Sequence, residues 1–217
     1  KGKKKQMFQT FLFTGVIFTA LLAFIPSNQW MLLLIAYVIT AIGFAGSNIF
    51  YDAFLVDVSE DANMDRVSSL GFALGYIGST IPFIICMVFV VLATLGKAPF
   101  SVETAYKISF IITALWWIGF SIPILRDVHQ VYGIEPEPHF VRNSFRRLGQ
   151  TLKEIRKHRH IFTFLLAYFF YIDGVDTIIK MATAYGSTIG IGSIMLLLIL
   201  LVTQFVAFPF AIIYGKL

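Results

Sequence analysis

The strongest constraint on this chain is the length of its uncharged, apolar stretches. A helix rises about 1.5 Å per residue, so it needs roughly 20 apolar residues to cross a hydrocarbon core of about 30 Å. Several stretches without Asp, Glu, Lys or Arg reach or approach that length. The sequence predicts six membrane spans: Met7–Phe24, Trp30–Tyr51, Val67–Gly96, Ile108–Leu125, a fifth that begins at Ile161, and Ile191–Tyr214.

The fifth span has two interpretations. Ile161–Ile172 is apolar but too short to cross alone, and Asp173, Asp176 and Lys180 follow it. Either the helix continues through these charges to about Tyr185, or the segment enters the membrane and returns on the same side.

Composition excludes a soluble fold. Of 217 residues 58% are hydrophobic and 13% are charged, whereas soluble domains carry about 25% charged residues. The single cysteine, Cys86, excludes a disulfide framework. We therefore expect an all-α, polytopic bundle of membrane helices.

The positions of the basic residues predict the topology. Lys1 and Lys3–Lys5 precede the first span, and the segment Val128–Arg159 is rich in Arg and Lys, whereas Pro26–Gln29 and Gly186–Gly190 have neither. Because basic loops stay on the cytoplasmic side, both ends and Val128–Arg159 are expected inside. The membrane itself is expected to be the cytoplasmic membrane of a bacterium. The net charge of +5 thus reflects topology and does not indicate nucleic-acid binding.

The basic central segment contains a predicted amphipathic helix. Its apolar residues recur at helical spacing, and basic residues occupy the other faces. This pattern is typical of a helix lying on an anionic inner leaflet, here over residues 140–157. The apolar stripe is Val141, Phe145, Leu148, Leu152 and Ile155, and the basic residues are Arg142, Arg146, Arg147, Lys153 and Lys157.

The charges of the fifth span form one stripe. Asp173, Asp176, Lys180 and Thr183 are separated by 3, 4 and 3 residues, which places them on one side of a helix. An ion pair between Asp176 and Lys180 would leave Asp173 unpaired near mid-membrane, where it could bind and release a proton. The alternative is a purely structural stripe.

Three further groups have a functional and a structural interpretation. Asn48, Tyr51 and Asp52 could line the same cavity or mark the end of the second span. The loop with Asp57, Glu60, Asp61 and Asp65 is acidic, and only Arg66 opposes its charge; its acids could form a gating charge latch with Lys3–Lys5, made in one state and broken in another, or be solvated. Gly71, Gly75 and Ser79 predict close helix packing, which would assist gating only where spans slide.

No enzyme motif is present. The sequence has no HExxH, phosphate loop or nucleophile elbow, and His129, His139, His158 and His160 lack metal-ligand spacing. Asp173-Gly174-x-Asp176 is faintly similar to an acidic motif of membrane lipid transferases, but the other residues of that motif are missing. We expect no enzyme activity, cofactor or metal.

Two stretches show a family pattern. One is Phe50-Tyr51-Asp52-Ala53-Phe54-Leu55 followed by Met64-Asp65-Arg66-Val67-Ser68-Ser69-x-Gly71-Phe72-Ala73-Leu74-Gly75-Tyr76-x-Gly78, and the other is Tyr171-x-Asp173-Gly174-Val175-x-Thr177-Ile178-x-x-Met181-Ala182. They resemble the vacuole effluxer (autophagy-related) family of the major facilitator superfamily. Asp173 falls in the pattern, Asp176 and Lys180 do not, and Val56 stands where proline is expected.

The resemblance implies an internal piece of a twelve-span protein, covering spans three to eight. Residues 1–127 would end the first bundle, 128–159 would form the central cytoplasmic loop, and 160–217 would begin the second bundle. It also implies alternating access between the bundles, and amino-acid efflux for the fungal members. We therefore expect a secondary transporter for a small solute; the alternatives are a solute-sensing membrane receptor and a lipid-modifying membrane enzyme.

Overall fold

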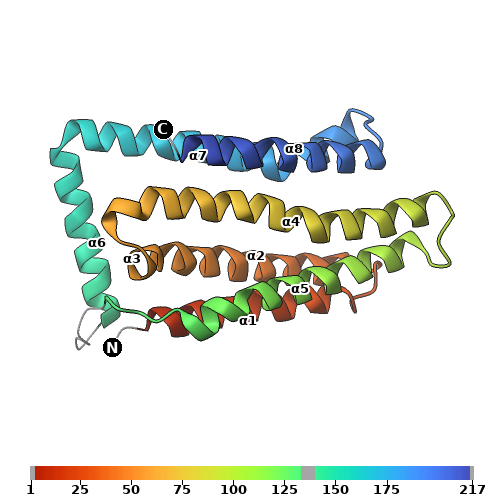
Figure 1. Ribbon diagram of the computed structural model, residues 1–217, viewed down its shortest axis with the longest axis horizontal. Coiled ribbons are helices and arrows are strands. Elements are labelled where there is room, and N and C mark those ends of the chain that lie inside the picture. The colour runs from red at the N-terminus through yellow and green to blue at the C-terminus, as the bar shows by residue number, and fades with distance from the viewer. Residues whose placement is uncertain (1–2, 133–139, 216–217) are drawn as a thin grey trace. The chain divides into compact units, whose positions relative to one another are not determined.

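The computed structural model describes residues 3–132 and 140–215, and within these ranges all regular elements are helical. Figure 1 colours them by residue number, from red at the N-terminus to blue at the C-terminus. Six of the described helices, namely α1, α2, α4, α5, α7 and α8, are long and apolar enough to cross a membrane, which confirms the six predicted spans. The elements are α1 Lys4–Leu22, α2 Trp30–Ala53, α3 Leu55–Val58, η1 Asp61–Asn63, α4 Met64–Thr94, α5 Val102–Asp127, α6 Phe140–Lys157, α7 Arg159–Thr188 and α8 Ser193–Tyr214.

The fifth span is one continuous helix. α7 runs for 30 residues through Asp173, Asp176 and Lys180, so the re-entrant alternative is wrong. The amphipathic pattern is also helical, as α6. Of its predicted apolar stripe, the side chain of Val141 lies outside the described residues.

Two of the long helices end in the same way. Gly96 after α4 and Gly190 after α7 have positive φ angles, +67° and +89°, which glycine adopts without strain. After α4, Gly96 N donates to Ala93 O and Lys97 N to Leu92 O. The two bonds satisfy carbonyl groups that the helix end leaves without partners, and α7 repeats the arrangement.

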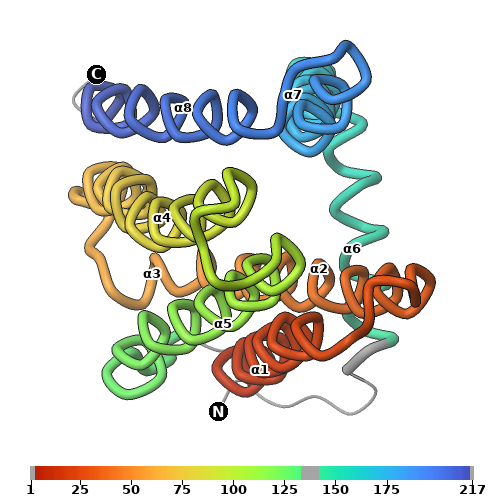
Figure 2. The backbone as a smooth tube through the Cα atoms, turned by 90° about the vertical axis from the view of Figure 1, so that its right-hand side faces the viewer, coloured from red at the N-terminus to blue at the C-terminus, as the bar shows by residue number. Residues whose placement is uncertain are grey.

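The chain divides into two compact units, Lys1–Ile134 with Leu197–Leu217, and Glu135–Leu196. In the first unit α1 contacts both α2 and α5, and α5 also contacts α4, as Figures 1 and 2 show. At the end where α1 begins, Phe8, Leu12 and Phe54 form a buried core cluster. The predicted division into a first bundle up to residue 127, a central loop of residues 128–159 and a second bundle from residue 160 stays a prediction.

Glycine allows α1 to approach its neighbours closely. A Cβ atom added at Gly43 of α2 would lie 2.6 Å from the Cα of Gly15 in α1. A Cβ at Gly15 would collide with the Trp117 ring of α5, and one at Gly46 with the Phe11 ring of α1. These contacts bring α1, α2 and α5 together through backbone and aromatic surface, as small residues do in membrane bundles.

Candidate functional site

The charged stripe of α7 forms the predicted local ion pair. Lys180 Nζ lies 3.2 Å from Asp176 Oδ2, and both side chains are more than half exposed, 71% and 56%. The acid precedes the base by four residues, which is the favourable order along a helix. Apart from Gly186, no described residue of α7 is buried, so the stripe lies on an open helix surface.

Asp173 does not take part in this ion pair, as the spacing predicts. Within the described ranges its carboxylate has no hydrogen-bond or ion-pair partner, and the residue is exposed. Beside it, a Cβ at Gly174 would meet nothing within 4 Å. Because Asp173 follows Ile161 by 12 residues, it stands about 18 Å along the apolar part of α7, a little more than half of the roughly 30 Å thickness of a hydrocarbon core.

The candidate residues of α2 share a face on the last turns of that helix. Asn48, Tyr51 and Asp52 are exposed, whereas the neighbouring Gly46 and Ser47 are buried, Gly46 against the Phe11 ring of α1. The structure brings one of them close to α4, because the Tyr51 hydroxyl lies 3.8 Å from where a Cβ of Gly71 would stand. Of the three residues, Tyr51 is thus the one placed beside α4.

Of the candidate gating residues of α4, Gly71 lies near Tyr51, whereas Gly75, Asp65 and Arg66 have open surroundings. A Cβ at Gly75 would meet nothing within 4 Å. Asp65 and Arg66 are exposed and have no ion-pair or hydrogen-bond partner in residues 3–132 and 140–215. Their role in gating stays a prediction.

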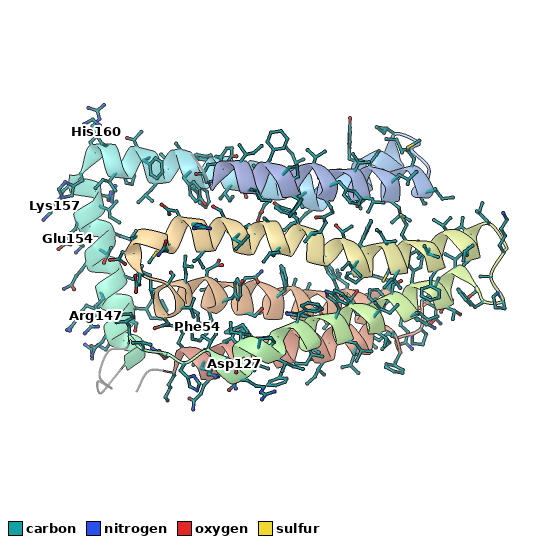
Figure 3. All side chains as sticks on the ribbon, in the orientation of Figure 1. Phe54, Asp127, Arg147, Glu154, Lys157 and His160 are labelled. Carbon is teal, nitrogen blue, oxygen red and sulfur yellow. The ribbon has the colours of Figure 1, made fainter. Side chains whose placement is uncertain are left out.

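A second ion pair involves one residue of the acidic segment, Asp57 in α3. Lys4 Nζ lies 2.6 Å from Asp57 Oδ2, and the Asp57 side chain has no exposed surface while that of Lys4 is 17% exposed. Lys4 Nζ also donates to the carbonyl oxygen of Ala53 at 2.8 Å and lies 5.2 Å from the centre of the Phe54 ring. Figure 3 labels Phe54 and, at the end of α5, Asp127.

The other carboxylate oxygen of Asp57 binds the segment that follows α5. Its Oδ1 accepts hydrogen bonds from the backbone amides of Val131 and Tyr132, each at 3.0 Å. Lys5 Nζ donates to the Val128 carbonyl oxygen at 2.7 Å, and Lys4 N donates to Gln130 Oε1 at 3.1 Å. We call this group, Lys4, Lys5 and Asp57 with Val128–Tyr132, the linker anchor.

Sequence reasoning considered an ion pair between the acidic segment and Lys3–Lys5, but it did not single out Asp57 and Lys4 as the partners. Glu60, Asp61 and Asp65 stay exposed, so the segment is divided between one buried acid and three solvated ones. One signal was present: among the four acids of this segment, Asp57 is the nearest to α2 and lies three residues after Phe54, a buried aromatic residue. The contact with Val131 and Tyr132 has no local signature, because 74 and 75 residues separate the partners.

Comparisons with known proteins agree on a family. The family model described as vacuole effluxer Atg22 like matches residues 1–215. A Bacillus subtilis protein named "Uncharacterized MFS-type transporter YxiO" is 60% identical over all of this chain and 51% of its own length. No solved structure matches.

Fungal relatives match more distantly. Autophagy-related protein 22 of Yarrowia lipolytica is 27% identical over 60% of this chain and 25% of its own length. Autophagy-related protein 22-2 of Aspergillus clavatus is 30% identical over 61% of this chain and 23% of its own length. The chain thus spans about half of the bacterial relative and a quarter of the fungal ones. With the family model matching almost every residue, and six described helices long and apolar enough to cross a membrane, the chain belongs to the vacuole effluxer Atg22 like family.

Proposed function

We propose that the protein is a proton-coupled secondary transporter that moves a small solute by alternating access. The observation behind this proposal is the charged stripe on α7, a helix of 30 residues that is long and apolar enough to span a membrane. Insertion of one charged residue at mid-membrane costs about 2.5–3.5 kcal/mol on translocon scales. Three such residues on one face therefore favour a water-filled pathway over a lipid-facing surface.

Within the stripe, we assign the coupling role to Asp173. Asp176 and Lys180 neutralise one another, whereas Asp173 has no partner in the described part of the chain. A carboxylate that alternates between a hydrated and a dry environment changes its affinity for a proton, because burial disfavours the charged form. Asn48, Tyr51 and Asp52 of α2 are assigned to the same pathway, and Asp65, Arg66, Gly71 and Gly75 to gating.

Amino acids are the proposed solutes. The family description, vacuole effluxer, supports export of a small solute. A zwitterion also suits a stripe that offers both an acid and a base, since its ammonium can bind Asp173 or Asp176 and its carboxylate can bind Lys180.

Flux measurements with the full-length protein test this function. Proteoliposomes loaded at one pH and diluted into another should accumulate or release a labelled amino acid against its gradient, and a protonophore should abolish the effect. Binding of the amino acid without accumulation would instead identify a solute-sensing receptor. Chemical change of a lipid or solute would identify an enzyme.

The proposed orientation places both ends and the central linker in the cytoplasm of a bacterium, and Gly186–Gly190 outside. Ser187 lies in the turn that ends α7. A cysteine introduced there, in a protein lacking Cys86, should react with an impermeant thiol reagent added to intact cells. If the cysteine reacts only after the cells are opened, Ser187 faces the cytoplasm and the proposed orientation is wrong.

We also propose that α6 binds the inner leaflet. Phe145, Leu148 and Leu152 of its apolar stripe are 71%, 55% and 55% exposed. In Figure 3 the labelled polar side chains of α6, Arg147, Glu154 and Lys157, project from the helix surface. An exposed apolar stripe beside basic residues favours a bilayer surface that contains anionic lipids.

A further inference from the structure

The segment that leaves α5 is attached to the first unit mainly by polar contacts. The side chains of Val131 and Tyr132 are 68% and 66% exposed, so they contribute little packing. Their backbone amides, in contrast, both donate to Asp57 Oδ1. Val128, three residues earlier, still packs against the core cluster around Phe8, Leu12 and Phe54. Beyond Val128 the chain is thus positioned by hydrogen bonds.

Asp57 can accept these bonds in a buried position because Lys4 neutralises it. The carboxylate uses Oδ2 for Lys4 and Oδ1 for the two amides, so that Asp57 joins three segments, its own included. These segments are the start of α1, the end of the α2–α3 region and the beginning of the central linker. A buried carboxylate without a counter-charge is strongly unfavourable, so loss of Lys4 should also displace Asp57.

We propose that Asp57 is a positioning residue that fixes the start of the central linker to the first unit, and that it does so only while it is paired with Lys4. Breaking the pair would release the amides of Val131 and Tyr132, while Val128 would stay in the core. The use of this anchor during transport rests on the proposed function, but the anchoring itself can be measured without any solute.

Amide hydrogen exchange of the full-length protein in nanodiscs tests the proposal. In Asp57→Ala, exchange at Val131 and Tyr132 should accelerate by roughly tenfold or more, because hydrogen bonds to a charged acceptor are lost. Lys4→Met should accelerate it similarly, although every acceptor atom is still present. Lys4→Arg keeps the charge and should stay close to the wild-type protein.

Glu103→Gln is the matched control. It breaks the pair between Lys107 Nζ and Glu103 Oε1, 2.8 Å apart and exposed, near the start of α5. Exchange at Val131 and Tyr132 should not change in this variant. Equal acceleration in Glu103→Gln and Asp57→Ala, unchanged exchange in Asp57→Ala, or identical behaviour of Lys4→Met and Lys4→Arg would each overturn the proposal.

A second variant covers the case in which Asp57→Ala unfolds the bundle, seen as lost protection throughout α5. Asp57→Asn keeps an oxygen acceptor and the side-chain size but loses the ion pair. Its exchange at Val131 and Tyr132 should be faster than in Glu103→Gln, and an equal rate would contradict the anchor. Since no flux is measured, a failure here and a failure of transport are distinguishable.

Discussion

Two ion pairs of the same chemistry occupy opposite environments in this chain. Asp176–Lys180 joins residues four positions apart on the exposed face of α7. Lys4–Asp57 joins residues 53 positions apart, and its carboxylate is fully buried. The first pair follows from helical geometry, whereas the second requires that the ends of several helices have already come together.

The difference shows that an ion pair takes its importance from its surroundings. In water a pair at this spacing stabilises a helix by about 0.2–0.5 kcal/mol. Breaking a buried pair by removing one partner costs about 3–5 kcal/mol, because a charge is left unpaired. If the proposed function is correct, the membrane surrounds Asp176–Lys180, and this pair should then behave as a buried pair rather than as an exposed one. Four predictions test this comparison.

The largest expected effect concerns Asp173, the acid that the α7 pair leaves over. Asp173→Asn keeps the size of the side chain and imitates a permanently protonated state. Transport driven by a pH gradient should fall to the background of empty proteoliposomes, while exchange of solute across the membrane survives. If Asp173→Asn keeps full gradient-driven transport, the stripe has a structural role. The same conclusion follows if Asp173→Asn abolishes expression while Asp176→Asn has no effect.

Removal of the cation from the buried pair should have the largest effect on stability. Lys4→Met leaves the Asp57 carboxylate buried without its counter-charge, and we expect a loss of about 3 kcal/mol. Thermal unfolding of the full-length protein in detergent measures it as a lower Tm. Lys107→Met, which breaks the exposed pair with Glu103, is the control and should leave the Tm nearly unchanged. Equal Tm values would show that the Lys4–Asp57 site is hydrated.

The α7 pair should behave as a buried pair only in the membrane. There, Asp176→Asn leaves Lys180 without its partner and should cost on the order of 3 kcal/mol, measured as reduced thermal stability in nanodiscs. The double variant Asp176→Asn with Lys180→Met removes both charges and should recover much of the loss. If Asp176→Asn alone leaves the thermal stability unchanged, the Asp176–Lys180 pair is hydrated.

The smallest effect is expected for α6, which uses its charges at a membrane surface. Replacing Phe145, Leu148 and Leu152 by Ser removes the apolar stripe, so amide exchange through α6 should rise several-fold in nanodiscs with anionic lipid. Gln150 and Glu154 lie on the opposite side of the helix, and their replacement by Ser is the control. Unchanged exchange in the triple variant would mean that the stripe does not contact lipid.

The helices could be predicted because their signal is local. Uncharged runs such as Trp30–Tyr51 correspond to α2, and the spacing of Asp176 and Lys180 yields the observed pair directly. The continuous α7 was the less certain case, since charges interrupt its apolar run. Helical continuity prevails there because all three charges lie on one face and leave the other faces apolar.

Tertiary contacts could not be predicted in the same way. The close approach of α1 and α2 at Gly15 and Gly43 depends on which helices are neighbours, and small residues were noted instead at Gly71 and Gly75. Gly43 and Gly46, three positions apart in an apolar run, carried a similar signal. The contacts of Asp57 with Val131 and Tyr132 depend on the path of a loop, for which the sequence has no periodic pattern.

The hydrogen bonds from Val131 and Tyr132 have a consequence for sequence variation. Asp57 recognises main-chain amides, and the side chains at both positions face outward. Every amino acid except proline supplies such an amide. Positions 131 and 132 can therefore accept almost any residue without loss of the contact, while a single proline at either one removes a donor. The contact instead constrains positions 57 and 4, because few residue types can replace the carboxylate of Asp57 or the charge of Lys4.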